Sequence, residues 1–188
     1  MDPGIRVNEA SGRWRLGGVR NRVLHSLRRR RALALLRRHR PVRSVLVVCH
    51  GNMCRSPFAA GLLRPWLSGR GVRVDSAGFL GPGRRSPPEA VAAAARYDVD
   101  LSAHRSQLLT AHGAGAADLI VVMDAAQRRQ VCDRFGRSER DVLVLGDVDP
   151  EPGEGRTIRD PVSQPLAVFE EAYARIERCA RELERAIG

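Results

Sequence analysis

The segment Ser44-Val-Leu-Val-Val-Cys-His-Gly-Asn-Met-Cys-Arg-Ser-Pro57 decides the fold. Its apolar run, residues 45–48, is short, continuous and rich in valine, which predicts a strand buried on both faces. Pro57 fits the first turn of a helix. Residues 49–56 then form a tight turn whose backbone N–H groups point toward an anion at the positive end of that helix. We therefore expect a phosphate-binding loop directly after the first strand.

The side chains of this loop suit covalent chemistry on a phosphoryl group. Cys49 lies at its mouth, and helix N-termini and cations favour the thiolate form of a cysteine, a strong nucleophile. The guanidinium of Arg55 offers a fixed fork that contacts two phosphoryl oxygens. Gly51 and Asn52 are residue types that tolerate positive φ. Ser56 offers a hydroxyl to the sulfur.

Other interpretations of Cys49 have less support. A buried structural cysteine is a common role, but a strand end needs neither a Gly-Asn pair nor an arginine and a hydroxyl in one turn. A zinc site with Cys49, His50 and Cys54 lacks a second Cys or His pair at ligand spacing. A nucleotide P-loop requires a lysine, and the chain contains none.

Strands and helices alternate along the rest of the chain. The apolar patterns predict further strands over 72–74, 119–123 and 142–145, and helices over 57–67, 88–97, 125–135 and 166–187. Such alternation implies a parallel sheet with right-handed crossovers and a site at the carboxyl ends of the strands. We expect an α/β fold: a three-layer, open, parallel four-stranded sheet with helices on both faces.

Charge is divided unevenly along the 188 residues. Residues 1–43 hold thirteen arginines against two acids, which accounts for the whole formal charge of +11, whereas residues 44–188 balance at nineteen and nineteen. Residues 19–38 predict a basic helix with Val19, Val23, Leu24 and Leu27 on one face, ended by Pro41. Composition favours a partly disordered, arginine-rich tail with one helix packed on the domain. The alternative is contact with acidic lipid headgroups, nucleic acid or an acidic protein.

Nothing in the sequence predicts a membrane span or a secretory signal. The apolar runs are shorter than the eighteen or so residues that span a bilayer, and the arginine-rich start lacks an adequate h-region and a cleavage site. The four cysteines form no dense disulfide framework, and thiolate chemistry needs a reducing compartment. We therefore expect a cytoplasmic protein.

Residues 45–57 closely resemble the signature of the low-molecular-weight protein tyrosine phosphatases, and further motifs follow in the family's order. Asp75-Ser-Ala-Gly78 is similar to the second-strand motif, residues 118–124 (Asp-Leu-Ile-Val-Val-Met-Asp) to the third strand, and Arg159-Asp-Pro161 to the loop that carries the general acid. The resemblance covers about residues 43–187. It divides the chain into a basic N-terminal extension, residues 1–42, and a phosphatase domain, residues 43–188.

The resemblance implies hydrolysis of phosphotyrosine in proteins through a phosphocysteine intermediate, without a metal or cofactor. Cys49 would attack phosphorus, Arg55 would hold the phosphoryl oxygens, and Asp160 would protonate the leaving oxygen and later act as the base. Without the resemblance, Asp160 reads as a solvated loop carboxylate beside a turn-forming proline. The remaining loop residues would bind phosphate, His50 through its backbone N–H: His50, Gly51, Asn52, Met53, Cys54 and Ser56.

Supporting roles and the substrate pocket follow from the same resemblance. Asn52, Ser56, Ser76 and His104 would form a hydrogen-bond network around the loop, although His104 is as readily a cap or core histidine. Family members usually have aromatic residues after the acid-proline pair, where this chain has Val162 and Ser163. The pocket walls would then come from Phe79, Leu80 and Val162.

Two related activities remain as alternatives. Protein arginine phosphatases also resemble this sequence, but they tend to place a small polar residue at the position of Met53, and a bulky methionine favours phosphotyrosine. Arsenate reductases of the same fold need relay cysteines, and Cys132 and Cys179 form no close pair.

Partners and redox regulation are also implied. Bacterial members often dephosphorylate tyrosine kinases of exopolysaccharide production, which are the partners that the resemblance implies. Cys54 is either a small buried filler or the partner of Cys49 in a reversible disulfide that protects the nucleophile.

Overall fold

A parallel sheet forms the centre of the molecule. The computed structural model describes residues 11–38, 41–152 and 155–187. The four strands are β1 (Ser44–Cys49), β2 (Arg73–Gly78), β3 (Leu119–Val122) and β4 (Val142–Val144). All neighbours pair in parallel in the order β2-β1-β3-β4. This confirms the predicted four-stranded parallel sheet and makes β1 a central strand.

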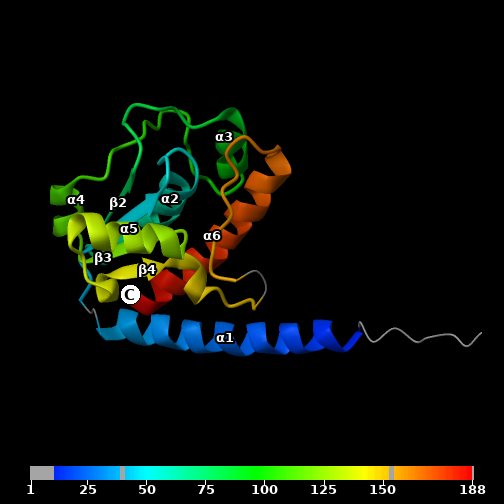
Figure 1. The fold of residues 1–188 in the computed structure, drawn as a ribbon. Coiled ribbons are helices and arrows are strands. Elements are labelled where there is room, and N and C mark those ends of the chain that lie inside the picture. Colours follow the sequence, from blue (N-terminus) through cyan, green and yellow to red (C-terminus); the bar gives the residue numbers. More distant parts are fainter. Residues whose placement is uncertain (1–10, 39–40, 153–154, 188) are drawn as a thin grey trace, which may run out of the picture.

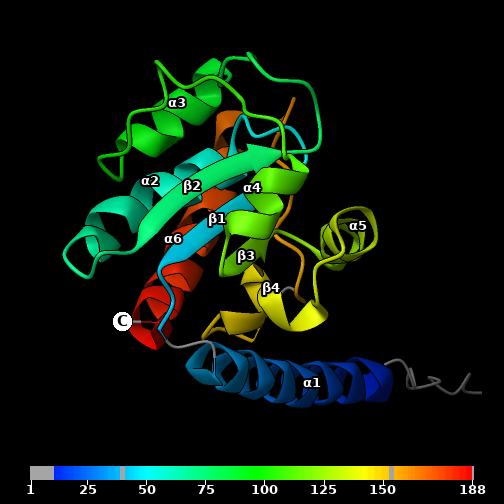
Figure 2. The ribbon, with the colours of Figure 1, turned by 90° about the vertical axis from the view of Figure 1, so that its left-hand side faces the viewer.

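Helices cover both faces of the sheet, as predicted (Figures 1 and 2). One face is covered by α2 (Arg55–Ser68), α3 (Pro88–Ala95) and α6 (Leu166–Ile187), and the other by α4 (Ala111–Ala116) and α5 (Ala125–Phe135). Short 3₁₀ helices, η1 (Glu139–Asp141) and η2 (Leu145–Val148), flank β4. The helix α4 was not predicted, because two glycines interrupt its apolar pattern. Its start is stabilised by Thr110, whose side chain accepts a hydrogen bond from the amide of Gly113.

The residues of β1 alternate between two hydrophobic cores. Val45, Val47 and Cys49 belong to the cluster beneath α2 and α6, and Leu46 and Val48 to the cluster beneath α5. Every residue of the strand is buried, as a strand with both faces covered requires. This burial fixes the register of β1 and therefore the position of Cys49 at its carboxyl end.

The N-terminal extension forms a long helix, α1 (Ser11–Arg38), that packs along one side of the domain beside η2 and α6 (Figure 1). Ala32 and Leu36 are buried, and Leu36 is fully inaccessible to solvent. The expected helix over 19–38 is therefore present and packs on the domain, and the expectation of partial disorder in the rest of the tail stays a prediction. The helix does not pack on the domain through the apolar residues noted in the sequence, because Val23, Leu24 and Leu27 are exposed. Residues 1–10 and the side chain of Val19 lie outside the described part.

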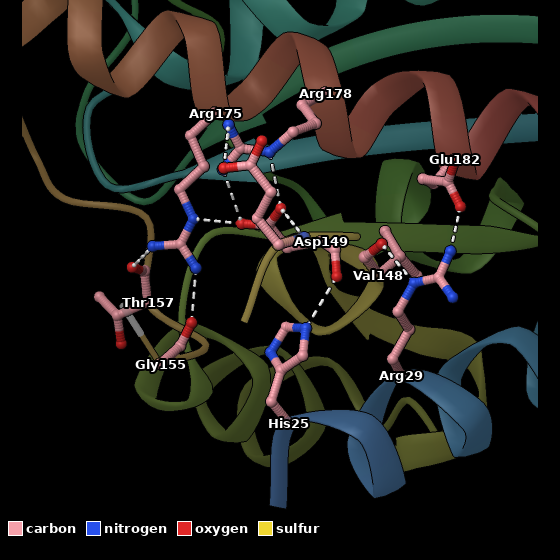
Figure 3. A network of polar contacts seen from close by, with 10 residues as sticks. His25, Arg29, Val148, Asp149, Gly155, Thr157, Arg175, Arg178 and Glu182 are labelled. Carbon is pink, nitrogen blue, oxygen red and sulfur yellow. Dashed lines mark hydrogen bonds and ion pairs between the residues drawn. The ribbon is translucent and has the colours of Figure 1, made fainter. Parts of the chain in front are cut away.

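Polar contacts fasten α1 to the domain (Figure 3). The Nε2 of His25 donates to the backbone carbonyl of Asp149 at 2.8 Å. Arg29 forms an ion pair with Glu182 of α6 and donates to the carbonyl of Val148. These bonds satisfy the carbonyl groups of the last residue of η2 and of the residue after it, so α1 covers polar backbone as well as apolar side chains.

Asp149 anchors a buried ionic cluster, the Asp149 cluster, which consists of Asp149, Arg175 and Arg178 (Figure 3). The carboxylate is 1% exposed and accepts the Nε of Arg175 at 2.9 Å and the Nε of Arg178 at 2.8 Å. The other guanidinium nitrogens of Arg175 donate to the carbonyls of Thr157 and Gly155. Arg175 thereby holds the chain segment that leads to Asp160.

The environment of Asp149 favours its charged form. Burial alone would raise the pKa of Asp149, but the hydrogen bonds from Arg178 and the Glu151 amide, with the nearby guanidinium charges, hold it below its usual value.

Among the residues that the structure describes, no helix has both the length and the apolar character needed to cross a membrane.

Replacing Asp149 by asparagine should destabilise the protein by about 3 kcal/mol at neutral pH, because two arginines lose their shared counter-charge. The folded-state pKa of Asp149 lies below the unfolded value of about 4, so the ionic stabilisation is complete above that value. It is lost as the pH falls through the folded-state pKa. Urea denaturation should therefore show a difference between the wild type and the variant that shrinks at low pH.

The matched control for this prediction is Asp133→Asn, a charge loss at an exposed position of α5. It should change the free energy of unfolding by less than about 0.5 kcal/mol. A deficit of Asp149→Asn that persists undiminished at acidic pH would contradict the ionic origin of the stabilisation.

Candidate active site

The loop between β1 and α2 brings a sulfur to the N-terminus of a helix. Cys49 ends β1 and is 2% exposed, and α2 begins at Arg55 without a side-chain cap. The amides of an uncapped first turn can bind an anion. The Sγ of Cys49 lies 3.0 Å from the Oγ of Ser56 in that turn. The structure thus brings the sulfur, the hydroxyl and the helix end together.

Asn52 holds the shape of the loop. Its φ is 51°, in the left-handed region, and it is fully buried. Its Nδ2 donates to the Oγ of Ser56 at 2.9 Å and to the Oγ of Ser76 at 3.0 Å. Its Oδ1 accepts the amide of Gln107 at 2.7 Å, and its carbonyl accepts the Nε2 of His104 at 2.8 Å. Residues of α2, of β2 and of the segment after α3 therefore each contribute a bond that stabilises the strained conformation.

This arrangement includes all four residues of the expected supporting network. The ring of His104 lies beside the loop, because its Nε2 donates to the backbone carbonyl of Asn52. The oxygen of Ser56 accepts from Asn52, so its hydroxyl proton is free to be donated to the sulfur of Cys49 at 3.0 Å or to the carbonyl of Ala77 at 3.4 Å. Gln107 was not predicted, because its contribution is a backbone amide, which the residue type does not reveal.

The end of β2 packs directly against the loop. A Cβ atom on Gly78 would lie 2.7 Å from the nitrogen of Asn52 and 2.9 Å from the carbonyl oxygen of His50, so only glycine fits there. The same His50 carbonyl accepts the amides of Phe79 and Leu80. The segment after β2 therefore stabilises the loop through its backbone.

Arg55 connects the loop to the segment that carries Asp160. Its Nη1 donates to the carbonyl of Ile158 at 3.1 Å, and its Nη2 forms an ion pair with the Oδ2 of Asp160. The Nε of Arg55 is buried and has no hydrogen-bond partner among the residues described. A buried guanidinium N–H without a partner is costly unless a ligand accepts from it. This donor therefore indicates an anion-binding position beside Cys49.

A cavity of about 150 Å³ opens over the loop. Leu80 and Val162 line it, together with Asp160 and the loop residues Cys49, His50, Gly51, Met53, Cys54 and Arg55. Phe79 is not part of the lining. Its half-buried ring packs against the core cluster beneath α5, on the other side of β2, and the expected aromatic wall is therefore absent from this cavity.

Arg84 also lines the cavity and was not predicted. It lies in a loop without motif signals, and its placement results from hydrogen bonds between its backbone and Ser106. The sequence did not predict a role for Tyr173 of α6 either, because its partner lies far away along the chain. Its hydroxyl donates to the carbonyl of Cys54 at 3.1 Å, and its ring stacks on Phe58 at 3.9 Å between centroids.

The other cysteines differ from Cys49 in their surroundings. Burial, together with the neighbouring Cys49 and Asp160, raises the pKa of the Cys54 thiol to about 12, so it is protonated at neutral pH. Cys132 packs against the opposite core cluster, and Cys179 is buried in α6. Neither lines the cavity. In the described ranges, no group of three or more His, Cys, Asp or Glu side chains could hold a metal ion.

Comparisons with known proteins agree with this geometry. A family model described as low molecular weight phosphotyrosine protein phosphatase matches residues 44–188. The chain is 40% identical over 137 residues to the probable low molecular weight protein-tyrosine-phosphatase EpsP of Ralstonia nicotianae, a match that covers 73% of this chain and 90% of that protein.

Solved structures with the same fold include two kinds of phosphatase. The Erwinia amylovora tyrosine phosphatase amsI is 30% identical, with a TM-score of 0.69, and the match covers 77% of this chain and 93% of that one. The YwlE arginine phosphatase from Geobacillus stearothermophilus is 27% identical, with a TM-score of 0.67, over 76% of this chain and 90% of that one. The chain belongs to the low-molecular-weight protein tyrosine phosphatase family.

Proposed function

We propose that this protein hydrolyses phosphotyrosine in proteins, that residues 43–188 carry the activity and that residues 1–42 are an extension. The observation that carries the proposal is the unpartnered, buried Nε of Arg55, next to the Cys49 sulfur at an uncapped helix start. This combination binds a phosphoryl group and presents a nucleophile to it.

The first step of the reaction transfers the phosphoryl group to the enzyme. The Cys49 sulfur forms a bond to phosphorus as the bond from phosphorus to the tyrosine oxygen breaks. Arg55 binds two of the phosphoryl oxygens, and it exchanges its contact with the Asp160 carboxylate for them. Asp160, released from Arg55, takes up a proton from solvent and gives it to the leaving phenolic oxygen, which would otherwise depart as a poorly stabilised anion.

The second step releases phosphate from the phosphocysteine. Asp160, now a carboxylate, takes a proton from water as the water oxygen attacks phosphorus. The sulfur leaves as a thiolate, and the hydroxyl of Ser56, 3.0 Å away, donates to it. Asn52 donates to the oxygen of that hydroxyl and leaves its proton available to the sulfur. Serine and asparagine thus act on the leaving group of the second step.

The cavity lining favours an aromatic phosphate ester. Met53, Leu80 and Val162 are the apolar residues around the entrance, and such side chains bury the faces of a phenyl ring. Arsenate reduction needs a cysteine relay, and neither Cys132 nor Cys179 lines the cavity.

A tyrosine kinase of exopolysaccharide production is the proposed protein substrate, and the cytoplasm is the proposed compartment.

Parallel assays distinguish the candidate activities. Phosphate release should be fastest from a phosphotyrosine peptide and slower from phosphoarginine and phosphoserine peptides of the same sequence. Arsenate should not be reduced in the presence of thioredoxin. A faster rate on phosphoarginine would replace the proposed activity by that of an arginine phosphatase.

Replacing Cys49 by serine should lower phosphotyrosine turnover by about a thousandfold or more, since the nucleophile of both steps is removed. Phosphate release from a phosphotyrosine peptide measures the effect. The matched control is Cys132→Ser on α5, which should retain the wild-type rate. Turnover that survives the change at Cys49 would exclude this residue as the nucleophile.

Replacing Asp160 by asparagine should slow the first step by about 10² to 10⁴ for phosphotyrosine, whose leaving group needs a proton. For p-nitrophenyl phosphate the loss should be much smaller, because nitrophenolate leaves unaided. Single-turnover release of the phenol measures this step alone. Arg159→Gln, at the exposed neighbouring position, is the control. Equal slowing of both substrates would show that Asp160 is not the acid.

A further inference from the structure

One face of α1 is fixed against the domain, which determines the face that points away. His25, Arg29, Ala32 and Leu36 lie along a single stripe of the helix, at intervals of three or four residues. His25, Ala32 and Leu36 are buried, and His25 and Arg29 bond to Asp149, Val148 and Glu182 (Figure 3). The opposite stripe is therefore exposed, and Figures 1 and 2 show no helix or strand packed on it. Its carboxyl-terminal part, with Arg31, Ala34 and Arg38, borders a cavity at the side of α1 that faces the η1 segment.

The outward stripe combines aliphatic and cationic side chains. Val23 and Leu27 are 54% and 46% exposed, and Ala34 continues their line along the helix. Arg30 lies on one side of this line, and Arg31 and Arg38 on the other, all exposed. We name these six residues, Val23, Leu27, Arg30, Arg31, Ala34 and Arg38, the outer face of α1.

The arginines of the outer face form no ion pair with any residue that the structure describes. No carboxylate among the described residues forms an ion pair with Arg30, Arg31 or Arg38, whereas Arg29, one position away, is paired. Residues 44–188 carry no net charge, so the formal charge of +11 belongs to residues 1–43. The outer face is therefore the natural contact for an anionic partner.

A cavity lies beside the outer face. It has a volume of about 560 Å³ and lies between α1 and the segment that contains η1. Arg31, Ala34, Leu35 and Arg38 line it from the helix, and Ser138, Arg140 and Asp141 from the domain. On the helix side of this cavity, aliphatic side chains (Ala34 and Leu35) lie next to guanidinium groups (Arg31 and Arg38).

We propose that the outer face of α1 binds the surface of an anionic lipid bilayer. Arginines on either side of an aliphatic line are the arrangement that places guanidinium groups at lipid phosphates and aliphatic groups among the upper acyl chains. Nucleic acid would use the arginines but gain nothing from exposed Val23 and Leu27. The inference does not depend on the proposed catalytic function.

The test uses the full-length protein and vesicles. The protein should co-sediment with vesicles of equal parts phosphatidylglycerol and phosphatidylcholine but not with phosphatidylcholine alone, and added salt should weaken the binding. Arg30→Gln combined with Arg31→Gln should reduce partitioning by about 25-fold, because each arginine near an anionic surface contributes a factor of about five. Leu27→Ser should reduce it severalfold at unchanged charge.

The matched control is Arg129→Gln combined with Arg134→Gln, an equal loss of charge at exposed positions on α5. Its partitioning should stay within about twofold of the wild type, and all variants should hydrolyse p-nitrophenyl phosphate at the wild-type rate. Absence of binding to the anionic vesicles would overturn the proposal. Equal losses in the control would show diffuse attraction by net charge. Binding insensitive to Leu27→Ser, with tight binding to duplex DNA, would assign the face to nucleic acid instead.

Discussion

The hydrogen bonds of Asn52 are the constraint on which the site depends, because they hold a non-glycine residue at positive φ in the middle of the loop. Four partners come from α2, from β2 and from the segment after α3. The loop therefore takes its shape only when β1, α2, β2 and the segment after α3 have come together. The site is in this sense a product of the whole fold, and a local peptide of residues 44–57 would lack most of these bonds.

The sequence predicted what local pattern and motif can carry. The valine-rich run and Pro57 located β1 and α2, and the sheet followed from alternation of strands and helices. Contacts made by backbone groups, such as the Gln107 amide, leave no mark on residue type and were missed. Tyr173 was missed because its partner is more than a hundred residues away. Phe79 was misplaced because the pleat of β2 and its continuation turn the ring to the other core.

The Asp149 cluster binds both the N-terminal extension and the segment that leads to Asp160. The backbone of Asp149 binds α1 through His25, and its side chain binds the arginine that holds Gly155 and Thr157. A charged extension, which composition favoured as partly disordered, is thus attached at the base of the segment that leads to the active site. Composition could not reveal this, because the docking stripe of α1 contains a histidine and an arginine rather than aliphatic residues alone.

The ion pair between Arg55 and Asp160 means that the enzyme carries its own competitor for the phosphate position. Any incoming ligand must displace a tethered carboxylate with a single negative charge. A phosphate monoester carries nearly two charges at neutral pH and has the stronger attraction to the guanidinium. Chloride, acetate and other monovalent ions lack that advantage. The resting site therefore favours divalent over monovalent anions, whatever the shape of the ligand.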